Sequence, residues 1–204
     1  MAPERGAINH LGESVDNIFS FLMELDKLKS VSRRAYISDL SRNENSAEHS
    51  WHLAIAILTL KEELDVDIDI NKTVKMALVH DICEIGAGDT FIFDPERSKK
   101  EIEEREYMGQ LSATPLEFAS EIVHLWEEYE EQVTRESRWV RVVDRLLPFM
   151  MNLNTDGKTW REHGIRRSQV VEINEVVRKE APEIYRWMLA QIERAVERKW
   201  LIDS

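Results

Sequence analysis

Cysteine, glycine and proline are scarce in this sequence, and long apolar runs are absent. Of the 204 residues, one is cysteine, seven are glycine and five are proline. A single cysteine, Cys83, cannot form an internal disulfide, and so few chain breakers do not suit a many-stranded sheet with its frequent turns. The longest apolar run, Leu53 to Leu58, is six residues long, whereas a membrane helix needs about 20. These absences predict an all-α protein with no membrane partner.

Positive charge is also deficient. The chain has 27 Lys and Arg against 39 Asp and Glu, which gives a formal net charge of -12. A surface that binds a nucleic-acid polymer needs an excess of basic residues, so we expect no such partner. The opening MAPERGAINH lacks the charged-then-apolar pattern of a secretory signal. Together with the lone cysteine, this predicts a cytoplasmic location.

Apolar residues recur three and four positions apart along most of the chain, as in helices that pack on a core. The length suits one domain, and we predict a single domain over residues 1–204. Asn45 and Glu48 have the spacing of a capping box at a helix start. We expect loops over 86–94 and 154–167. The expected helices are 15–29, 46–64, 72–84, 95–111, 115–131, 135–153, 168–179 and 182–198.

The pair His80-Asp81 stands where an apolar helix gives way to a glycine-rich turn. An imidazole and a carboxylate at a helix end can converge on one divalent cation, and Glu84 follows one turn after His80 on the same face. Glu84 and Asp89 could equally be solvated charges at a helix end and a turn. Their closeness to the pair makes them candidates for the same site.

Asp144 interrupts an apolar stripe formed by Val140, Val143, Leu147 and Met151. A buried carboxylate costs several kcal/mol unless a cation or hydrogen-bond donors lie beside it. Asp144 is therefore a candidate metal ligand, and a salt bridge to a neighbouring arginine, Arg141 or Arg145, is the alternative.

A second candidate ligand, His49, stands near the predicted start of helix 46–64, although a lone histidine on such a helix is more often structural. The remaining histidines are interpreted as structural or surface residues: His10, His52, His124 and His163.

His49, His80-Asp81 and Asp144 stand in the order H…HD…D, and in this the chain resembles the HD-domain superfamily of metal-dependent phosphohydrolases. The stretches ENSAEH, HDICEIGAGD and LWEEYE are similar to the helical 5'-deoxynucleotidase branch. WREHGI, at 160–165, is similar to a segment of a bacterial subgroup of HD hydrolases. The resemblance covers about residues 21–153 and implies an all-α HD fold with that core, on which C-terminal helices 168–198 pack.

The resemblance implies one divalent metal ion held by His49, His80, Asp81 and Asp144. Mixed nitrogen and oxygen ligands suit Mn, Co, Fe, Ni or Zn, and Mg is also compatible. Only His124 lies between the HD pair and Asp144, whereas two-metal phosphodiesterases need additional histidines there. One metal is therefore expected.

Three further residues take roles from the same resemblance. In the deoxynucleotidase branch, the glutamate after the HD pair works near the scissile phosphate, and an aspartate after the glycine turn contacts the sugar; these match Glu84 and Asp89. An arginine fifteen residues before the first ligand binds phosphate, which is Arg34 here, with Arg33 beside it. The bulky Trp that follows this arginine in the bacterial enzyme of the branch helps shape the sugar site and is Ala35 here, so the resemblance does not decide between deoxyribose and ribose.

The expected activity is release of phosphate from nucleoside or deoxynucleoside 5'-monophosphates by a homodimer. The guanosine-tetraphosphate hydrolases of the superfamily carry an acidic pair after the HD pair, whereas here Glu84 is followed by Ile85. Removal of pyrophosphate is therefore not the expected activity. One alternative is a hydrolase of another small phosphate, such as a nucleoside triphosphate. Another is a regulatory protein that binds a nucleotide without turning it over. The presence of Arg34, Glu84 and Asp89 beside the four ligands favours the enzyme.

Overall fold

The structure is a computed structural model that describes residues 5–94 and 97–204, with side chains described from residue 14 and omitted over 95–99. Its long helices are α1 (Arg5–Asp26), α2 (Ser46–Leu64), α3 (Ile70–Val79), α5 (Arg97–Ser112), α6 (Glu117–Glu131), α7 (Arg135–Asn154) and α11 (Pro182–Glu197). Shorter helices are the 3-10 turn η1 (Lys27–Ser30), α4 (Glu84–Ala87), α8 (Lys158–Glu162), α9 (Arg167–Ile173) and α10 (Glu175–Glu180). The predicted all-α class is confirmed.

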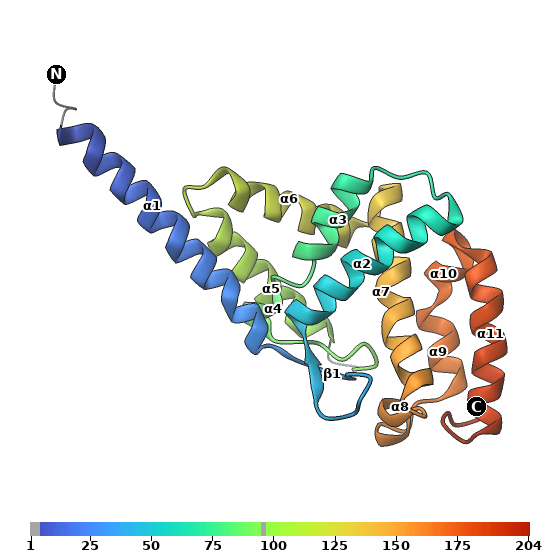
Figure 1. Ribbon diagram of the computed structural model, residues 1–204. Helices are drawn as coiled ribbons and strands as arrows, with labels where there is room; N and C mark the ends of the chain where they lie inside the picture. The colour runs from blue at the N-terminus through green and yellow to red at the C-terminus, as the bar shows by residue number, and fades with distance from the viewer. Residues whose placement is uncertain (1–4, 95–96) are drawn as a thin grey trace.

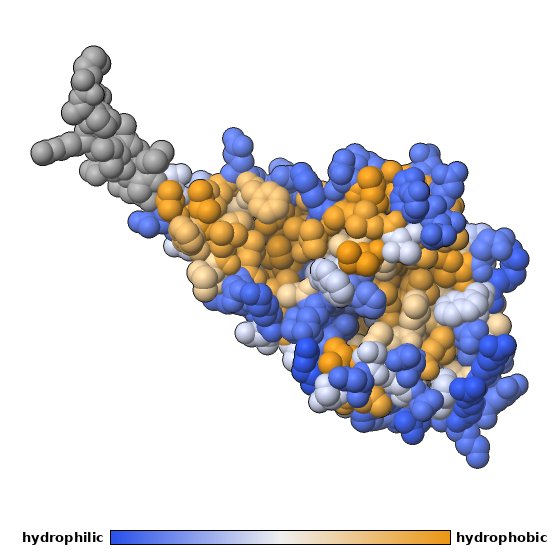
Figure 2. Space-filling view, viewed as in Figure 1, coloured by the Kyte–Doolittle hydropathy of each residue, from blue (hydrophilic) through white to orange (hydrophobic). Residues whose placement is uncertain are grey.

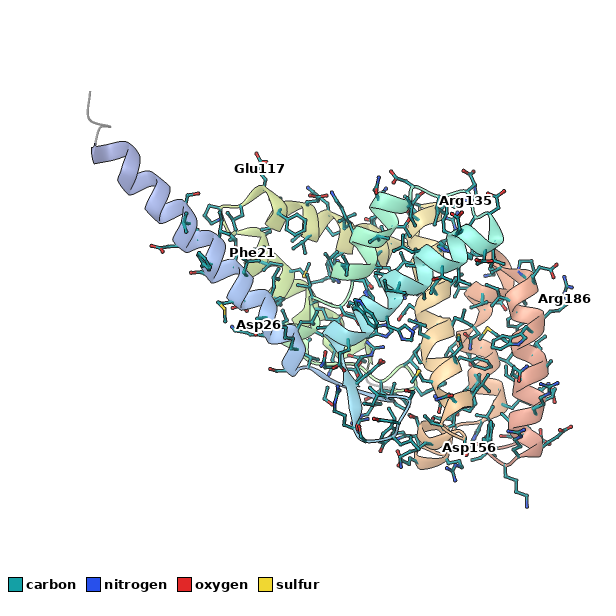
Figure 3. The ribbon with its side chains drawn as sticks, in the orientation of Figure 1. Phe21, Asp26, Glu117, Arg135, Asp156 and Arg186 are labelled. Atoms are coloured by element: carbon teal, nitrogen blue, oxygen red, sulfur yellow. The ribbon has the colours of Figure 1, made fainter. Side chains whose placement is uncertain are left out.

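Helix α7 lies at the centre of the body and contacts α2, α3, α6 and α10. It spans the body from Arg135 at one end to a point near Asp156 at the other (Figure 3). The predicted apolar stripe is buried over three of its four residues, since Val140 and Val143 have 0% exposure and Leu147 has 3%, while Met151 is half-buried. Burying each such side chain contributes about 1.5–3 kcal/mol, so this stripe fixes α7 and with it Asp144.

A short hairpin precedes α2. Its strands β1 (Ser32–Tyr36) and β2 (Asn43–Asn45) pair antiparallel, with Ser32 opposite Asn45. The expected capping box is present, because Asn45 Oδ1 accepts from the Glu48 amide at 2.9 Å and a Glu48 carboxylate oxygen accepts from the Asn45 amide at 3.2 Å. The hairpin and cap together fix the first turn of α2, which carries His49.

The predicted helix 72–84 is wrong at its end, because α3 stops at Val79 and α4 begins at Glu84. Between them the backbone bonds tighten to a three-residue spacing, with the Ile82 amide 3.1 Å from the Val79 carbonyl. Residues 80 and 81 therefore lie in a turn after α3. The predicted loop 86–94 is shorter than expected, since α4 continues through Ala87.

Two predictions in the C-terminal third are also wrong. The expected loop 154–167 contains α8, which is anchored by the buried Trp160, and five residues are too few for a periodic signal. The expected helix 168–179 is divided into α9 and α10 at Asn174, whose side-chain Nδ2 donates to the Val170 carbonyl at 2.7 Å. An asparagine that binds its own backbone competes with helical bonding at that point.

The remaining helices agree with prediction to within a few residues, apart from α1, which begins ten residues earlier than expected and ends at Asp26. Pro95, the predicted start of the fourth helix, lies outside the described residues. Figure 1 shows α1 projecting from the body at the opposite side from α11. Among the described residues, no helix combines the length and apolar character needed to cross a bilayer.

The α8 turn depends on Gly157, and this generates a stability prediction. Gly157 has φ +65°, and a Cβ there would lie 2.5 Å from Trp200 Cβ. Gly157→Ala therefore introduces left-handed strain and overpacking, together about 2 kcal/mol or more. The control is Gly109→Ala on α5, where a Cβ has nothing within 4 Å and helix propensity favours alanine by about 1 kcal/mol. Urea unfolding of both variants tests this, and wild-type stability in Gly157→Ala would contradict it.

Candidate functional site

The four predicted ligands come together in the structure. His49 lies in the first turn of α2, His80 and Asp81 follow α3, and Asp144 lies in the middle of α7. Donor atoms of His49, His80 and Asp81 all lie within 4.8 Å of one another. Asp144 Oδ1 is 3.0 Å from His49 Nε2 and 3.9 Å from His80 Nε2. Three separate segments thus supply two imidazoles and two carboxylates to one point.

His80 has the geometry of a metal-binding imidazole. Its Nδ1 donates to the Ala77 carbonyl at 2.9 Å, so the buried Nε2 carries the lone pair. That Nε2 makes no hydrogen bond, although Asp81 Oδ1 is only 3.1 Å away. Burial lowers the pKa of His80, and this outweighs the attraction of Asp81 and Asp144 for a proton. Two acceptor atoms this close repel each other when no proton lies between them. The arrangement therefore fits a cation bound by both atoms.

His49 and Asp144 form a buried pair. Burial and Arg33 lower the pKa of His49, but hydrogen bonds to Asp144 and Glu44 outweigh them and raise it to about 9. Burial raises the pKa of Asp144, yet the His49 hydrogen bond and the Arg145 charge hold it well below its ordinary value. Asp144 is therefore an ionised carboxylate, and in this structure its charge is paired with the protonated His49.

The second oxygen of Asp144 is held from the other side. Tyr129 on α6 donates its hydroxyl to Oδ2 at 3.1 Å, and Arg145 Nη1 lies 3.2 Å from the same atom. The Tyr129 ring also meets the His80 ring edge-on at 5.2 Å, and the Arg141 guanidinium lies 4.3 Å from its centroid. The salt bridge considered as an alternative for Asp144 is thus present with Arg145, and it leaves Oδ1 facing the histidines.

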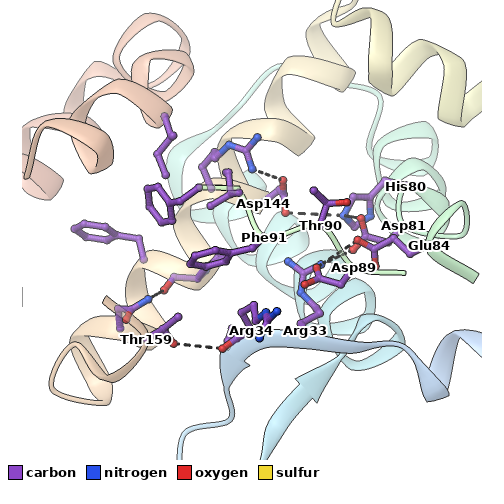
Figure 4. Close-up of a pocket in the computed structure, with 18 of the residues that line it drawn as sticks. Arg33, Arg34, His80, Asp81, Glu84, Asp89, Thr90, Phe91, Asp144 and Thr159 are labelled. Carbon is purple, nitrogen blue, oxygen red and sulfur yellow. Dashed lines mark hydrogen bonds and ion pairs between the residues drawn. The ribbon is translucent and has the colours of Figure 1, made fainter. Parts of the chain in front are cut away.

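Arg33 neutralises a group of buried carboxylates next to the histidines. Its Nη1 is 2.7 Å from Asp81 Oδ2 and 3.7 Å from Asp89 Oδ1, and its Nε is 3.2 Å from Glu44 Oε1. Burial lowers the pKa of Arg33, but these carboxylates, Asp81 foremost, raise it above its ordinary value. Figure 4 shows Arg33 among Asp81, Glu84 and Asp89. The charge of Arg33 is thus paired with carboxylates of the site itself.

Glu84 and Asp89 are both in this cluster, and neither is the solvated charge considered above. Burial and the neighbouring Asp81 raise the pKa of Glu84 well above its ordinary value, against the effect of Arg33. Ser46 donates its hydroxyl to Glu84 Oε2 at 2.5 Å. Burial also raises the pKa of Asp89, and Arg33 opposes that rise. A carboxyl group with a raised pKa is suited to donate a proton.

Arg34 is exposed and lines the same pocket from β1. Its carbonyl accepts from Asn43 Nδ2 at 3.0 Å and from Thr159 Oγ1 at 3.4 Å, which fixes its backbone. No hydrogen bond or ion pair to its guanidinium occurs among the described residues, and Arg33 beside it is fully engaged. Arg34 therefore has a charge available for an anion in the pocket.

The cluster opens into a pocket of ≈ 1120 Å³, counted with the solvent at its mouth. Arg33, Asp81, Glu84 and Asp89 line one end, and aromatic and aliphatic side chains from the 90–93 segment, α7, α8 and α9 line the other. Ala35 is 9% exposed and also lines it. The pocket thus combines a charged end with an apolar end.

Sequence reasoning did not assign Arg33, Glu44 or Tyr129 to the site. Glu44 and Tyr129 lie inside the quoted stretches ENSAEH and LWEEYE, so the motif was a signal for both. The other histidines do not join the donor cluster: His124 and His163 are exposed, and His52 stacks on Trp51. The side chain of His10 lies outside the described residues.

A family model for the HD domain matches residues 25–185. The chain is also similar to curated relatives. It is 31% identical over 137 residues to the 5'-deoxynucleotidase HDDC2 of Bos taurus, covering 66% of this chain and 65% of that protein. It is 31% identical over 146 residues to HDDC2 of Xenopus laevis, covering 69% and 68%. The chain thus spans about two thirds of the length of these relatives.

A solved structure extends the likeness over nearly the whole chain. This is a predicted metal-dependent phosphohydrolase from Magnetospirillum magnetotacticum, with a TM-score of 0.85 and 38% identity. The match covers 92% of this chain and 95% of that one. From the family model and these likenesses, the chain belongs to the HD domain family.

Proposed function

We propose that this protein is a metal-dependent phosphomonoesterase that releases phosphate from nucleoside 5'-monophosphates, with deoxynucleotides as the leading candidates. The observation that carries the proposal is the unpartnered His80 Nε2 beside Asp81, His49 and Asp144, at the charged end of a pocket. The names of the similar proteins, 5'-deoxynucleotidase and metal-dependent phosphohydrolase, support the same chemistry.

The donor set fits one divalent metal ion held by His49, His80, Asp81 and Asp144, with Mn, Co, Fe, Ni, Zn or Mg as candidates. When bound, such an ion polarises a phosphoryl oxygen and lowers the pKa of a water molecule. Tyr129 and Arg145 orient Asp144, and the Ala77 carbonyl sets the tautomer of His80. These contacts hold the ligands in place before the ion arrives, as is typical of metal sites.

The side chains around the donors supply the remaining functions of a phosphate-ester hydrolase. Arg34 binds a phosphoryl oxygen with its guanidinium, and Glu84 carries the proton that the leaving 5' oxygen takes up. Asp89 contacts the sugar. Arg33 keeps Asp81 and Asp89 in place and offsets their repulsion of the phosphate dianion.

The same proposal covers the oligomeric state, the partners and the location of the protein. We propose a homodimer, which the exposed apolar residues of α1 support: Val15, Ile18, Phe19, Leu22 and Met23. Figure 2 shows this apolar surface continuing from α1 onto the adjoining body. The net charge of -12 argues against a nucleic-acid polymer as substrate. The buried, unpaired Cys83 is compatible with the cytoplasm.

The direct test is phosphate release before and after metal removal. Chelator-treated protein is expected to be inactive and to regain activity with a first-row divalent ion, because the phosphoryl charge needs a cation that Arg34 alone does not replace. Nucleoside and deoxynucleoside mono-, di- and triphosphates are compared, and the 5'-monophosphates are expected to be the best substrates. Undiminished activity without metal would contradict the metal role. Phosphate release from triphosphates alone would favour a nucleoside triphosphate hydrolase. Metal-bound protein that is inactive on all of these substrates would favour a regulatory protein that binds a nucleotide without turning it over.

Two substitutions separate proton transfer from phosphate binding. Glu84→Gln keeps the size and removes the acid, so turnover is expected to fall on the order of 10²-fold or more with metal content unchanged. Arg34→Ala is expected to raise KM as well as lower kcat, since a phosphate clamp acts in ground and transition states. Steady-state kinetics on one deoxynucleoside monophosphate, with metal analysis, measures both.

The controls for these variants are surface residues of the same types. Glu62→Gln on α2 and Arg186→Ala on α11 change exposed side chains outside the pocket, and both are expected to behave as wild type. Wild-type turnover in Glu84→Gln would remove Glu84 from the proposed chemistry.

A further inference from the structure

The pocket extends along α7, away from the carboxylates. Asp144, Pro148 and Asn152 recur every four residues and all line it. Eight residues of α-helix rise about 12 Å, which is enough for a sugar and a ring beyond the phosphate site. The walls at this end are Phe91, Phe93, Phe149, Trp160, Val170 and Ile173. The view in Figure 4 places the C-terminal helices on the opposite side of the pocket from His80, Asp81 and Glu84.

Besides His80 Nε2, two buried side-chain atoms of the pocket lining have no hydrogen-bond partner among the described residues, Thr90 Oγ1 and Asn174 Oδ1. The second lies beside Val170 and Ile173 of the apolar wall. Asn174 lines the pocket at the break between α9 and α10 and is 1% exposed. Its Nδ2 donates to the Val170 carbonyl at 2.7 Å, whereas its Oδ1 has no hydrogen bond. The Val170 contact fixes the orientation of the amide, because a flip would set two oxygens against each other. Asn174 therefore offers an unpaired acceptor, beside an amide nitrogen that is held by the Val170 carbonyl.

The other asparagine of the pocket shows the contrast. Asn152 Nδ2 donates to the Pro148 carbonyl at 3.0 Å, and its Oδ1 accepts from the Trp160 amide at 3.2 Å. Both ends of that amide are engaged, the nitrogen within α7 and the oxygen between α7 and α8. An unmade hydrogen bond at a buried acceptor costs about 1–3 kcal/mol, so the free Oδ1 of Asn174 needs a specific reason.

We propose that the apolar end of the pocket binds the nucleobase, with Asn174 Oδ1 accepting a hydrogen bond from an N–H group on the base edge. This inference rests on the proposed function and adds a specificity-determining residue to it. A flat ring with an N–H group suits this end, because the Phe149 and Trp160 rings, 5.5 Å apart, offer aromatic surface and Asn174 offers the acceptor. An alkyl group would leave the acceptor unpaired.

The test uses three substrates with the same scissile 5' ester. Deoxyadenosine monophosphate has its base N–H groups only in the 6-amino group, purine deoxyriboside monophosphate lacks that group, and deoxyribose 5-phosphate lacks the base. Wild-type protein is expected to favour the adenine substrate over the unsubstituted purine by about tenfold or more in kcat/KM. This comparison needs no variant, so it decides the inference even if substitutions at Asn174 impair folding.

Asn174→Leu, of similar size and without the acceptor, is expected to abolish that preference. Its kcat/KM on deoxyribose 5-phosphate is expected to match wild type, which separates loss of base recognition from loss of folding. Equal wild-type activity on the two purine substrates, or a preference that survives in Asn174→Leu, would overturn the inference while leaving the proposed function intact. Failure of wild-type protein to hydrolyse any of the three with metal present would overturn both.

Discussion

Repulsion among buried carboxylates is the constraint on which the site depends. Glu44, Asp81, Glu84, Asp89 and Asp144 come together in the interior, where each uncompensated charge costs several kcal/mol. Arg33 compensates one side of this group, and His49 and Arg145 compensate Asp144. His80 Nε2, 3.1 Å from Asp81 Oδ1, has no hydrogen-bond partner among the described residues. A divalent cation there would complete the balance of charge, and the proposed chemistry uses the same cation.

The helical scaffold explains how so unfavourable a cluster is held together. The apolar stripe of α7 fixes Asp144 from one side, and the capping box of α2 fixes His49 from another. The turn after α3 directs His80 and Asp81 toward them. Burial of apolar side chains on α7 and its neighbours offsets the cost of the polar centre. The site is thus supported by the parts of the fold that are packed most completely.

These parts were also the most predictable from the sequence. A charge that interrupts an apolar stripe predicts a site role for Asp144, and the Asn45–Glu48 spacing correctly predicts the start of α2. The family resemblance gives Arg34 the phosphate role, but the role of Arg33 could not be predicted, since it depends on which side of a short strand faces the acids. Nor could α8 and the break at Asn174 be foreseen, because one depends on Gly157 and Trp200 meeting across the chain and the other on a side chain that binds its own helix. The local periodicity of apolar residues therefore predicts the helices. The shape of the pocket depends on contacts between residues far apart in the sequence, which that periodicity does not show.

The central claim is that His49, His80, Asp81 and Asp144 hold one metal ion. Crystals soaked in Mn²⁺ and measured by anomalous diffraction test it most directly. The account predicts one strong peak about 2.0–2.3 Å from an imidazole nitrogen of each histidine and a carboxylate oxygen of each aspartate. No peak at this point, or a peak from an ion that is bound by Glu44, Glu84 or Asp89 instead, would contradict the proposed ligand set.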